Sequence, residues 1–285
     1  MDQEYGLLDT DDDIRGDEWE EIDYSDTEAD RIARKRDREF DEFRKRIKDA
    51  DQFKVEASVF DDATYGALYK LVQDGHIDAF GGPISTGKEA NVYTALAGED
   101  EVAVKIYRIN ASDFREMGEY LEGDPRFDRV GKSKKAVVMA WVRKEFANLV
   151  RARKAGVRVP EPIAVERNVL VMEYIGTEAG RAKRLTEVHI ENPQTAYEVI
   201  REYMVRLYDA GIVHGDLSEF NVVVHDSELY IIDVGQAVTV HHPNSDDFLD
   251  RDCKNVANFF ARQGVETSGE QLRSYIEEHA DPTPS

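Results

Sequence analysis

The feature that most constrains the fold of this chain is a glycine-containing segment followed by a regular alternation of apolar and polar residues. Residues 81–93 read GGPISTGKEANVY, and apolar and polar residues then alternate through NVYTALAGEDEVAVKIYRI. Alternation with a period of two is typical of β-strands, and AGEDE suits the turn between them. The sequence therefore predicts a glycine-bearing loop that connects strands, rather than a strand that leads into a helix.

The same segment nearly matches the Walker A phosphate loop. Gly82, Gly87 and Lys88 fit that pattern, but Glu89 stands where a Ser or Thr is needed to bind Mg²⁺. A Walker A loop also runs into a helix whose N-terminus cradles the phosphates. A loop that covers phosphates from between two strands, as in protein kinases, is therefore favoured. A GTPase that uses Thr86 and Lys88 stays open as an alternative.

A lysine in the predicted strand VAVKIY supplies the cation that such a phosphate site requires. Lys105 is surrounded by apolar residues, and a buried ammonium group needs a carboxylate partner. Glu145, in the amphipathic helical segment KKAVVMAWVRKEFANLVRARKAG, is the expected partner. Residues 110–133 contain Gly, Pro and mixed charges and are predicted to be a mobile loop. That loop carries three rival carboxylates, which are Glu116, Glu119 and Glu122.

Three polar residues further along have the spacing of a phosphoryl-transfer site. HGDLSEFN places Asp216 five residues before Asn221, and Asp233 follows Asn221 by twelve residues at the end of an apolar run. In a kinase catalytic loop the Asp orients the attacking hydroxyl and the Asn binds Mg²⁺. A hairpin of NVVV and LYII would bring Asn221 and Asp233 to neighbouring strand ends. These residues, together with Lys105, predict a magnesium–nucleotide site.

The net charge of −22 argues against general nucleic-acid binding and favours a protein that works at high salt concentration. Such a field repels nucleic acid, which argues against general RNA coating and sequence-specific DNA binding. Acidic residues are spread along the whole chain, which favours adaptation to a saline cytoplasm, where charges are strongly screened. A basic partner is the alternative explanation. No apolar run is long enough to cross a membrane and no signal segment is visible, so a cytoplasmic protein is expected.

The chain is expected to have three parts. Residues 1–57 are acidic and then basic, and are expected to be largely disordered apart from a charged helix in RIARKRDREFDEFRKRIK. Residues 58–174 would form an N-lobe with a twisted antiparallel sheet and one long helix. Residues 175–285 would form a mainly helical C-lobe, with a hinge near residues 173 to 178. This is an α+β, bilobal, protein-kinase-like fold.

The motifs STGKEANVY, HGDLSEFN and IDVGQAV, followed by HPNSDDFLDRDCKNVANFF, resemble the RIO family of atypical serine/threonine protein kinases, specifically its first subfamily. The resemblance runs from about Ser58 to about Gly264. It implies ATP and Mg²⁺ as cofactors, with Mn²⁺ as a possible substitute. Together with the evenly spread acidic residues, it leads us to expect an archaeal, halophilic member of the family. It also implies action in late maturation of the small ribosomal subunit, with that 30S or pre-40S-like particle, its rRNA or its proteins, as partner.

The resemblance also implies a role for each matching residue. Asp216 would be the catalytic base, and Asn221 and Asp233 the Mg²⁺ ligands. Asp233 would also take up the phosphoryl group as a transient aspartyl phosphate. The expected nucleotide-binding residues are Ser85, Thr86, Gly87, Lys88, Lys105 and Glu145, with the backbone of Glu173 and Ile175 facing adenine.

Two departures from ordinary protein kinases qualify the expected activity. Those enzymes have Lys or Arg two residues after the catalytic Asp, whereas this chain has Ser218, so one source of transition-state charge compensation is missing. Only 52 residues follow Asp233, without the segment on which conventional kinases dock peptides. Autophosphorylation or ATP turnover is therefore favoured over phosphorylation of extended peptides. A non-catalytic scaffold for ribosome assembly stays open as a further alternative.

Three histidines and one cysteine near these motifs are interpreted as structural. His214 is expected to pack and to bond the backbone rather than to act as a base. His241 and His242 are expected on a loop surface, because a third metal ligand at suitable spacing is missing. Cys253 is the single cysteine and is expected to be a small buried hydrophobe.

Overall fold

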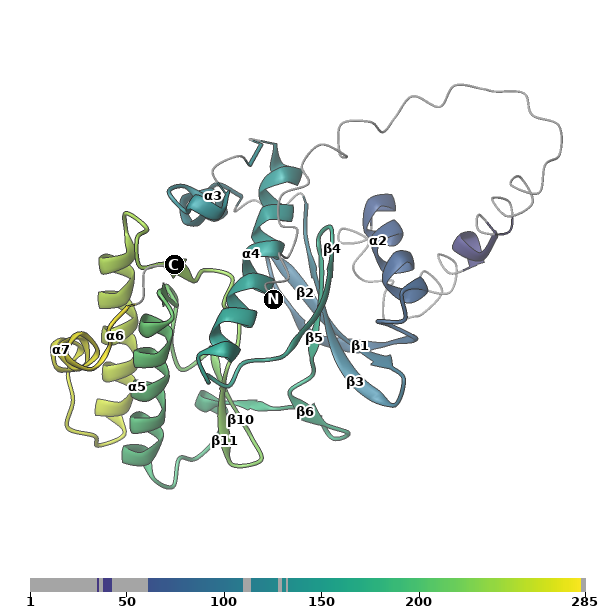
Figure 1. Cartoon of the computed structure of the whole chain (residues 1–285). Coiled ribbons are helices and arrows are strands. Elements are labelled where there is room, and N and C mark those ends of the chain that lie inside the picture. The colour runs from purple at the N-terminus through teal and green to yellow at the C-terminus, as the bar shows by residue number, and fades with distance from the viewer. Residues whose placement is uncertain are drawn as a thin grey trace. The chain divides into compact units, whose positions relative to one another are not determined.

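The fold is built on a five-stranded antiparallel sheet and a set of packed helices (Figure 1). The computed structural model describes residues 35, 38–42, 61–109, 114–127, 130, 131 and 133–282. The chain divides into two units, Met1–Lys54 and Val55–Ser285. In the first unit the described residues 38–42 are helical, inside the basic run where the sequence predicts a helix. The other predictions for residues 1–57 lie outside the described residues.

The sheet belongs to the N-lobe, the name used here for the described residues from 61 to 174. Its strands are β1 (Ala79–Thr86), β2 (Ala90–Ala97), β3 (Asp100–Tyr107), β4 (Pro162–Glu166) and β5 (Val169–Glu173). They lie in the order β1-β2-β3-β5-β4, and all neighbours are antiparallel. The alternating pattern after Lys88 thus forms β2 and β3, as predicted. The turn between β4 and β5 contains Arg167 in the left-handed region, with φ 50°.

Two helices of the N-lobe are capped at both ends, and the second of them lies where the sequence predicts a long helix. α2 (Asp62–Gln73) begins at Asp61, whose side chain accepts a hydrogen bond from the Thr64 N–H at 2.7 Å, and Gly75 follows it with φ 78°. α4 (Lys134–Lys154) begins at Ser133 in the same way. A side-chain acceptor at the start and a left-handed glycine after the end satisfy backbone groups that the helix leaves unpaired.

The segment predicted as a mobile loop contains a helix, so this prediction is wrong. Residues 114–121 form α3 (Phe114–Leu121), and a short 3-10 turn, η3 (Pro125–Phe127), follows. Met117 and Leu121 are 1% and 6% exposed, because residues four apart lie on the same face of a helix. The glycine of this helix, Gly118, lies where an added side chain would meet open space, so it does not disturb the buried face.

The C-lobe, from residue 175 onward, contains three helices and several short strands. The helices are α5 (Pro193–Asp209), α6 (Ser245–Arg262) and α7 (Gly269–His279). The strands are β6 (Gly176–Thr177), β7 (Gly180–Arg181), β8 (Lys183–Arg184), β9 (Ile212–Val213), β10 (Val222–His225), β11 (Glu228–Ile231) and β12 (Val238–Thr239), with η4 (Leu185–Glu187) between β8 and α5. One hydrophobic core joins α4 to this lobe through residues such as Trp141, Leu217 and Phe260. The loops of a nucleotide site would therefore be mounted on a continuous packed platform.

Two further sequence predictions concern the burial of Cys253 and the possibility of a membrane-spanning helix. Cys253, in α6, is fully buried, as predicted, and burial raises the pKa of its thiol to about 12. Among the described residues, no helix combines the length and the apolar character that crossing a bilayer requires.

Candidate active site

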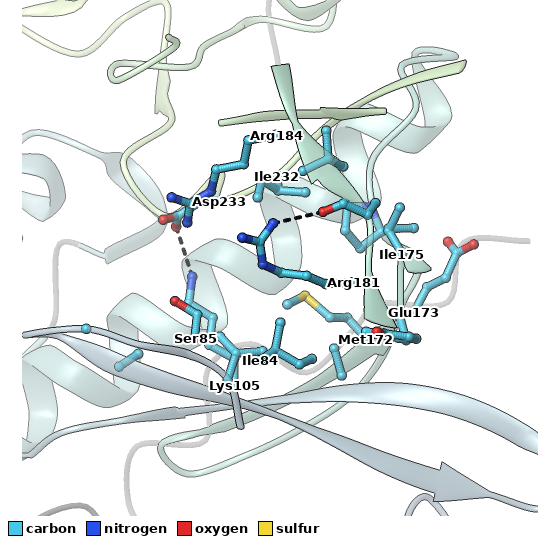
Figure 2. Close-up of a pocket in the computed structure, with 18 of the residues that line it drawn as sticks. Ile84, Ser85, Lys105, Met172, Glu173, Ile175, Arg181, Arg184, Ile232 and Asp233 are labelled. Atoms are coloured by element: carbon cyan, nitrogen blue, oxygen red, sulfur yellow. Dashed lines mark hydrogen bonds and ion pairs between the residues drawn. The ribbon is translucent and has the colours of Figure 1, made fainter. Parts of the chain in front are cut away.

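A cavity of about 470 Å³ lies where the sheet meets the C-lobe (Figure 2). Its N-lobe wall comes from the β1–β2 loop, from β3 and from the end of β5. Its C-lobe wall comes from the segment after β5, from β8 and β10, and from residues 232 and 233. The predicted site residues that line it are Ser85, Gly87, Lys88, Lys105, Glu173, Ile175 and Asp233. Thr86, Glu145, Asp216 and Asn221 are not among its lining residues. Thr86 is an exposed residue at the end of β1.

The glycine-bearing loop connects two strands, as expected for a phosphate cover. β1 ends at Thr86 and β2 begins at Ala90, so Gly87 to Glu89 form a tight reversal closed by a hydrogen bond from the Gly87 N–H to the Ala90 carbonyl, 3.0 Å. No helix follows Lys88, and the geometry of a Walker A loop is therefore not formed.

Lys105 links the two lobes at the inner wall of the cavity. Its Nζ donates to Glu145 Oε1 at 2.7 Å and to Asp233 Oδ1 at 2.9 Å. Tyr107, which sequence reasoning missed, donates its hydroxyl to the second oxygen of Glu145. Ala103, Lys105 and Tyr107 alternate along β3 and all line the cavity, because residues two apart in a strand share a face.

The charges in this cluster stabilise one another. Burial alone would lower the pKa of Lys105, but the negative charges of Asp233 and Glu145 outweigh it and hold that pKa well above its usual value. The Lys105 ammonium in turn lowers the pKa of Asp233. Lys105 is thus a permanently charged group that faces the cavity with 7% of its surface exposed.

The hairpin of β10 and β11 brings the predicted metal ligands to neighbouring strand ends. Val222 pairs with Ile231, and the Ile232 N–H donates to the Asn221 carbonyl at 2.9 Å, so Asp233 follows directly. Asn221 Nδ2 donates to the Asp216 carbonyl at 2.7 Å, which ties the catalytic loop to this end of the hairpin. Asp233 has φ 64°, a conformation that is rare outside glycine and that concentrates at functional sites.

A buried aspartate that sequence reasoning missed fixes the catalytic loop. Asp252, in α6, accepts hydrogen bonds from the N–H groups of Gly215 and Leu217, both at 2.7 Å. Asp216 lies between those two residues. Although Asp216 is an exposed residue, desolvation of its carboxyl by the surrounding protein raises its pKa, and the charge of Asp233 adds to that effect.

His214 has the structural surroundings that the sequence predicts. It is 3% exposed, and its Nδ1 accepts from the Asp216 N–H at 3.3 Å. Burial lowers the pKa of His214 to about 4, so the imidazole is neutral at physiological pH.

Two further side chains of α4, also missed from sequence, hold the loop after Asp233. Lys144 Nζ donates to the Gly235 carbonyl at 2.8 Å, and Asn148 Nδ2 donates to the carbonyls of Val234 and Ala237 at 3.0 and 2.8 Å. Both side chains are fully buried, and burial lowers the pKa of Lys144 to about 7. A polar cluster at positions 144, 145 and 148 of an otherwise apolar helical face was the signal for this role.

α3 contacts the C-lobe next to the catalytic loop, and this corrects the prediction for His242. His242 is 3% exposed instead of lying on a loop surface, and its ring Nε2 is 3.1 Å from the Glu119 carbonyl. Tyr120 stacks on Phe248 of α6 with ring centroids 4.9 Å apart. Arg251 donates to both the Tyr120 hydroxyl and the Gly215 carbonyl. The helix hidden in the predicted loop supplies the partners that bury His242; His241 is exposed, as predicted.

The segment after β5 lines the cavity, and its backbone is only partly hydrogen-bonded within the described residues. The Glu173 N–H donates to the Glu161 carbonyl at 2.8 Å, and the Ile175 carbonyl accepts from the Ala182 N–H at 2.9 Å. Within the described part of the chain, the Ile175 N–H makes no hydrogen bond. A base in this part of the cavity could therefore bond to the Ile175 N–H but not to that of Glu173.

Known protein kinases resemble this chain in sequence. Residues 91–272 match the family model described as RIO domain. The protein from Haloferax volcanii named RIO-type serine/threonine-protein kinase Rio1 is 69% identical over 278 residues, which cover 97% of this chain and 96% of that protein. The Rio1 protein of Methanocaldococcus jannaschii is 37% identical over 243 residues, 84% of this chain and 83% of that protein.

A solved structure shares the fold. The Rio2 kinase–ADP/Mg²⁺–phosphoaspartate complex from Chaetomium thermophilum has a TM-score of 0.58 and 24% sequence identity, over 75% of this chain and 66% of that one. The predicted α+β, protein-kinase-like fold is thereby confirmed. On the family match and the Rio1 relatives, this chain belongs to the RIO family of serine/threonine-protein kinases, type 1.

Proposed function

We propose that this protein transfers the γ-phosphoryl group of ATP, in a Mg²⁺-dependent reaction, in the cavity between Lys105 and Asp233. The observation that carries this proposal is the pair of hydrogen bonds from Lys105 Nζ to Glu145 and to Asp233, at 2.7 and 2.9 Å. A charged lysine on β3, held by a helix glutamate, is the arrangement with which protein kinases bind nucleotide phosphates.

The residues at the end of the β10–β11 hairpin fit a magnesium ion. Asn221 uses its amide nitrogen on the Asp216 carbonyl, which leaves its side-chain oxygen as a ligand, and Asp233 has a second carboxylate oxygen beyond the one that Lys105 contacts. Mg²⁺ is commonly bound by one or two protein oxygens together with substrate phosphates and water. When bound, the ion would neutralise charge that develops on the transferred phosphoryl group.

The proposed chemistry follows from the positions of two carboxylates. Asp216, with its raised pKa, would orient an acceptor hydroxyl and receive its proton. Alternatively, an oxygen of Asp233 would attack the γ-phosphorus while the bond to the bridging oxygen of ADP breaks, which gives an aspartyl phosphate. Water would then hydrolyse the acyl phosphate and release inorganic phosphate. The phosphoaspartate of the Rio2 complex from Chaetomium thermophilum supports this second route.

The proposed setting is late maturation of the small ribosomal subunit. Its support is membership in the type 1 RIO family, and the partner would be the 30S or pre-40S-like particle, through its rRNA or its proteins. Cosedimentation of the full chain with small subunits, with and without ATP, tests this setting. Binding that does not respond to nucleotide would favour the non-catalytic scaffold instead.

The reaction itself is tested by incubating the full chain with γ-labelled ATP and Mg²⁺ in high salt. Three products are measured in one sample: an acid-stable seryl label, a hydroxylamine-sensitive acyl label and free phosphate. We expect free phosphate together with at least one protein label, and loss of the acyl label in Asp233→Asn. Absence of all three products would refute the proposed enzyme, and turnover of GTP but not ATP would favour the GTPase alternative.

A further inference from the structure

The cavity has a shortage of positive charge at its phosphate end. Ser218 occupies the position where ordinary protein kinases have Lys or Arg, so the catalytic loop contributes no cation there. Lys105 already balances the carboxylates of Glu145 and Asp233. A nucleotide triphosphate brings several further negative charges, and Mg²⁺ neutralises only part of them. Lys88 lines the cavity from the exposed β1–β2 loop, so a further cation close to Asp233 would have to come from the C-lobe.

Arg184 lies at this position. It belongs to β8, whose backbone is held by pairing with β10, where Arg184 is opposite Val223. Its side chain is half-buried and lines the cavity, and Figure 2 shows its guanidinium directed to the same end of the cavity as Asp233. The charge of Arg184 contributes to the lowered pKa of Asp233, after the larger effect of Lys105.

The guanidinium of Arg184 is available for a ligand. Among the described residues it makes no ion pair, and no hydrogen bond from its side chain is formed. The other arginine of the cavity, Arg181, differs, because its two terminal nitrogens contact Glu187 at 2.8 Å each. A half-buried guanidinium that makes no ion pair within the described residues, on a strand held by pairing, is suited to bidentate binding of phosphate oxygens.

We propose that Arg184 binds the phosphate chain of the nucleotide and supplies the charge compensation that Ser218 cannot. This inference rests on the proposed function. It adds a phosphate-binding residue from β8, outside the glycine-bearing, catalytic and metal loops. It predicts that the contribution of Arg184 to binding grows with the number of phosphates on the ligand.

Lys183 offers a matched control. It is the neighbouring residue of β8, it is exposed, and it does not line the cavity, because successive residues of a strand point to opposite faces. Arg184→Gln and Lys183→Gln therefore remove the same charge from adjacent positions, and only the first removes it from the cavity.

The test is calorimetric binding of adenosine, ADP and ATP, each with Mg²⁺ at one fixed salt concentration, to the full-length wild type, Arg184→Gln, Arg184→Lys and Lys183→Gln. In Arg184→Gln we expect ATP binding to weaken by about tenfold, ADP binding by less and adenosine binding by less than about twofold. Lys183→Gln should bind all three ligands as the wild type does. Arg184→Lys should recover part of the ATP affinity, because it keeps the charge and loses the bidentate geometry.

Two results would overturn the inference while leaving the proposed function intact. One is wild-type ATP affinity in Arg184→Gln. The other is an equal loss of adenosine and ATP affinity, which would mean that Arg184 only shapes the cavity. Failure of the wild type itself to bind ATP would instead overturn the proposed function, and this inference with it.

Discussion

Lys105 and Asp233 are 128 residues apart in the sequence, yet the lysine Nζ lies 2.9 Å from the aspartate Oδ1. The contact joins β3 of the N-lobe to the end of β11 in the C-lobe. A nucleotide that enters the cavity would meet a cation and an anion that already neutralise each other. Phosphates and Mg²⁺ can then replace this internal pair with Lys105–phosphate and Asp233–metal contacts, without leaving either charge unpaired.

Lys105 and Lys88 should differ sharply in their importance for ATP turnover. Lys105→Met removes the cation that contacts both carboxylates, and we expect the rate of phosphate release to fall by about 100-fold or more. Lys88 also lines the cavity but lies exposed in the β1–β2 loop, so Lys88→Met should lower the rate much less, by about tenfold or less. Initial rates at saturating ATP decide the comparison, and the reverse order would restore the Walker A interpretation.

Glu145 should contribute strongly to the stability of the folded chain. Glu145→Gln leaves the buried Lys105 ammonium with Asp233 as its remaining carboxylate partner, and we expect the free energy of unfolding to fall by about 3 kcal/mol. Tyr107→Phe removes only a neutral hydroxyl that bonds the same carboxylate, and should cost about 1 kcal/mol. Denaturant unfolding of the two variants measures both effects. If Glu145→Gln is as stable as the wild type, the ion pair between Lys105 and Glu145 does not stabilise the fold, which would contradict the interpretation of their 2.7 Å contact.

His214 should make the protein less stable as the pH falls from about 6.5 to about 4. The unfolded histidine binds a proton near pH 6.5, whereas the pKa of the folded residue is about 4, so the unfolded state is favoured between these values. The charged groups that influence it are Asp233 and Lys144. We expect the stability difference between the wild type and His214→Gln to shrink by about 2 to 3 kcal/mol between about pH 7.5 and about pH 4.5. Parallel stability curves for the two proteins would contradict the buried, neutral histidine.

Salt should stabilise the folded chain strongly. The net charge of −22 produces self-repulsion in the compact state, and salt at molar concentration shortens the screening length to about 3 Å. We expect the melting temperature to rise by roughly 10 °C or more between about 0.2 M and about 2 M KCl. Sucrose at matched water activity serves as the control, since it does not screen charge. A melting temperature that does not respond to KCl would favour a basic partner as the reason for the acidity.

The sequence predicted those parts of the fold and site that depend on short-range patterns. Alternation indicated β2 and β3, and the position of Lys105 within VAVKIY indicated its direction into the cavity. The hairpin spacing predicted the approach of Asn221 to Asp233, because register in an antiparallel pair follows from the residues on either side of the turn. Whether these residues have the catalytic roles assigned to them stays a prediction.

The missed residues depend on contacts between segments far apart in the chain. Lys144, Asn148 and Asp252 bond to loop backbone that lies between 35 and 91 residues away. Nothing local distinguishes a lysine that caps a carbonyl in the core from one on a solvated helix face. α3 was missed for a related reason, because Tyr120 stacks on Phe248 and the Glu119 carbonyl contacts His242, and both partners lie more than 120 residues further along the chain.

The most direct test of the central claim is phosphate release from Mg²⁺–ATP by purified Asp216→Ala and Asp233→Ala, measured beside the wild type. Asp247→Ala, which removes an exposed carboxylate of α6 away from the cavity, is the matched control. If the two carboxylates act on the nucleotide as proposed, both variants remain folded by circular dichroism and release no phosphate above background, while the control releases it at the wild-type rate. Wild-type release by either Asp216→Ala or Asp233→Ala would contradict the account.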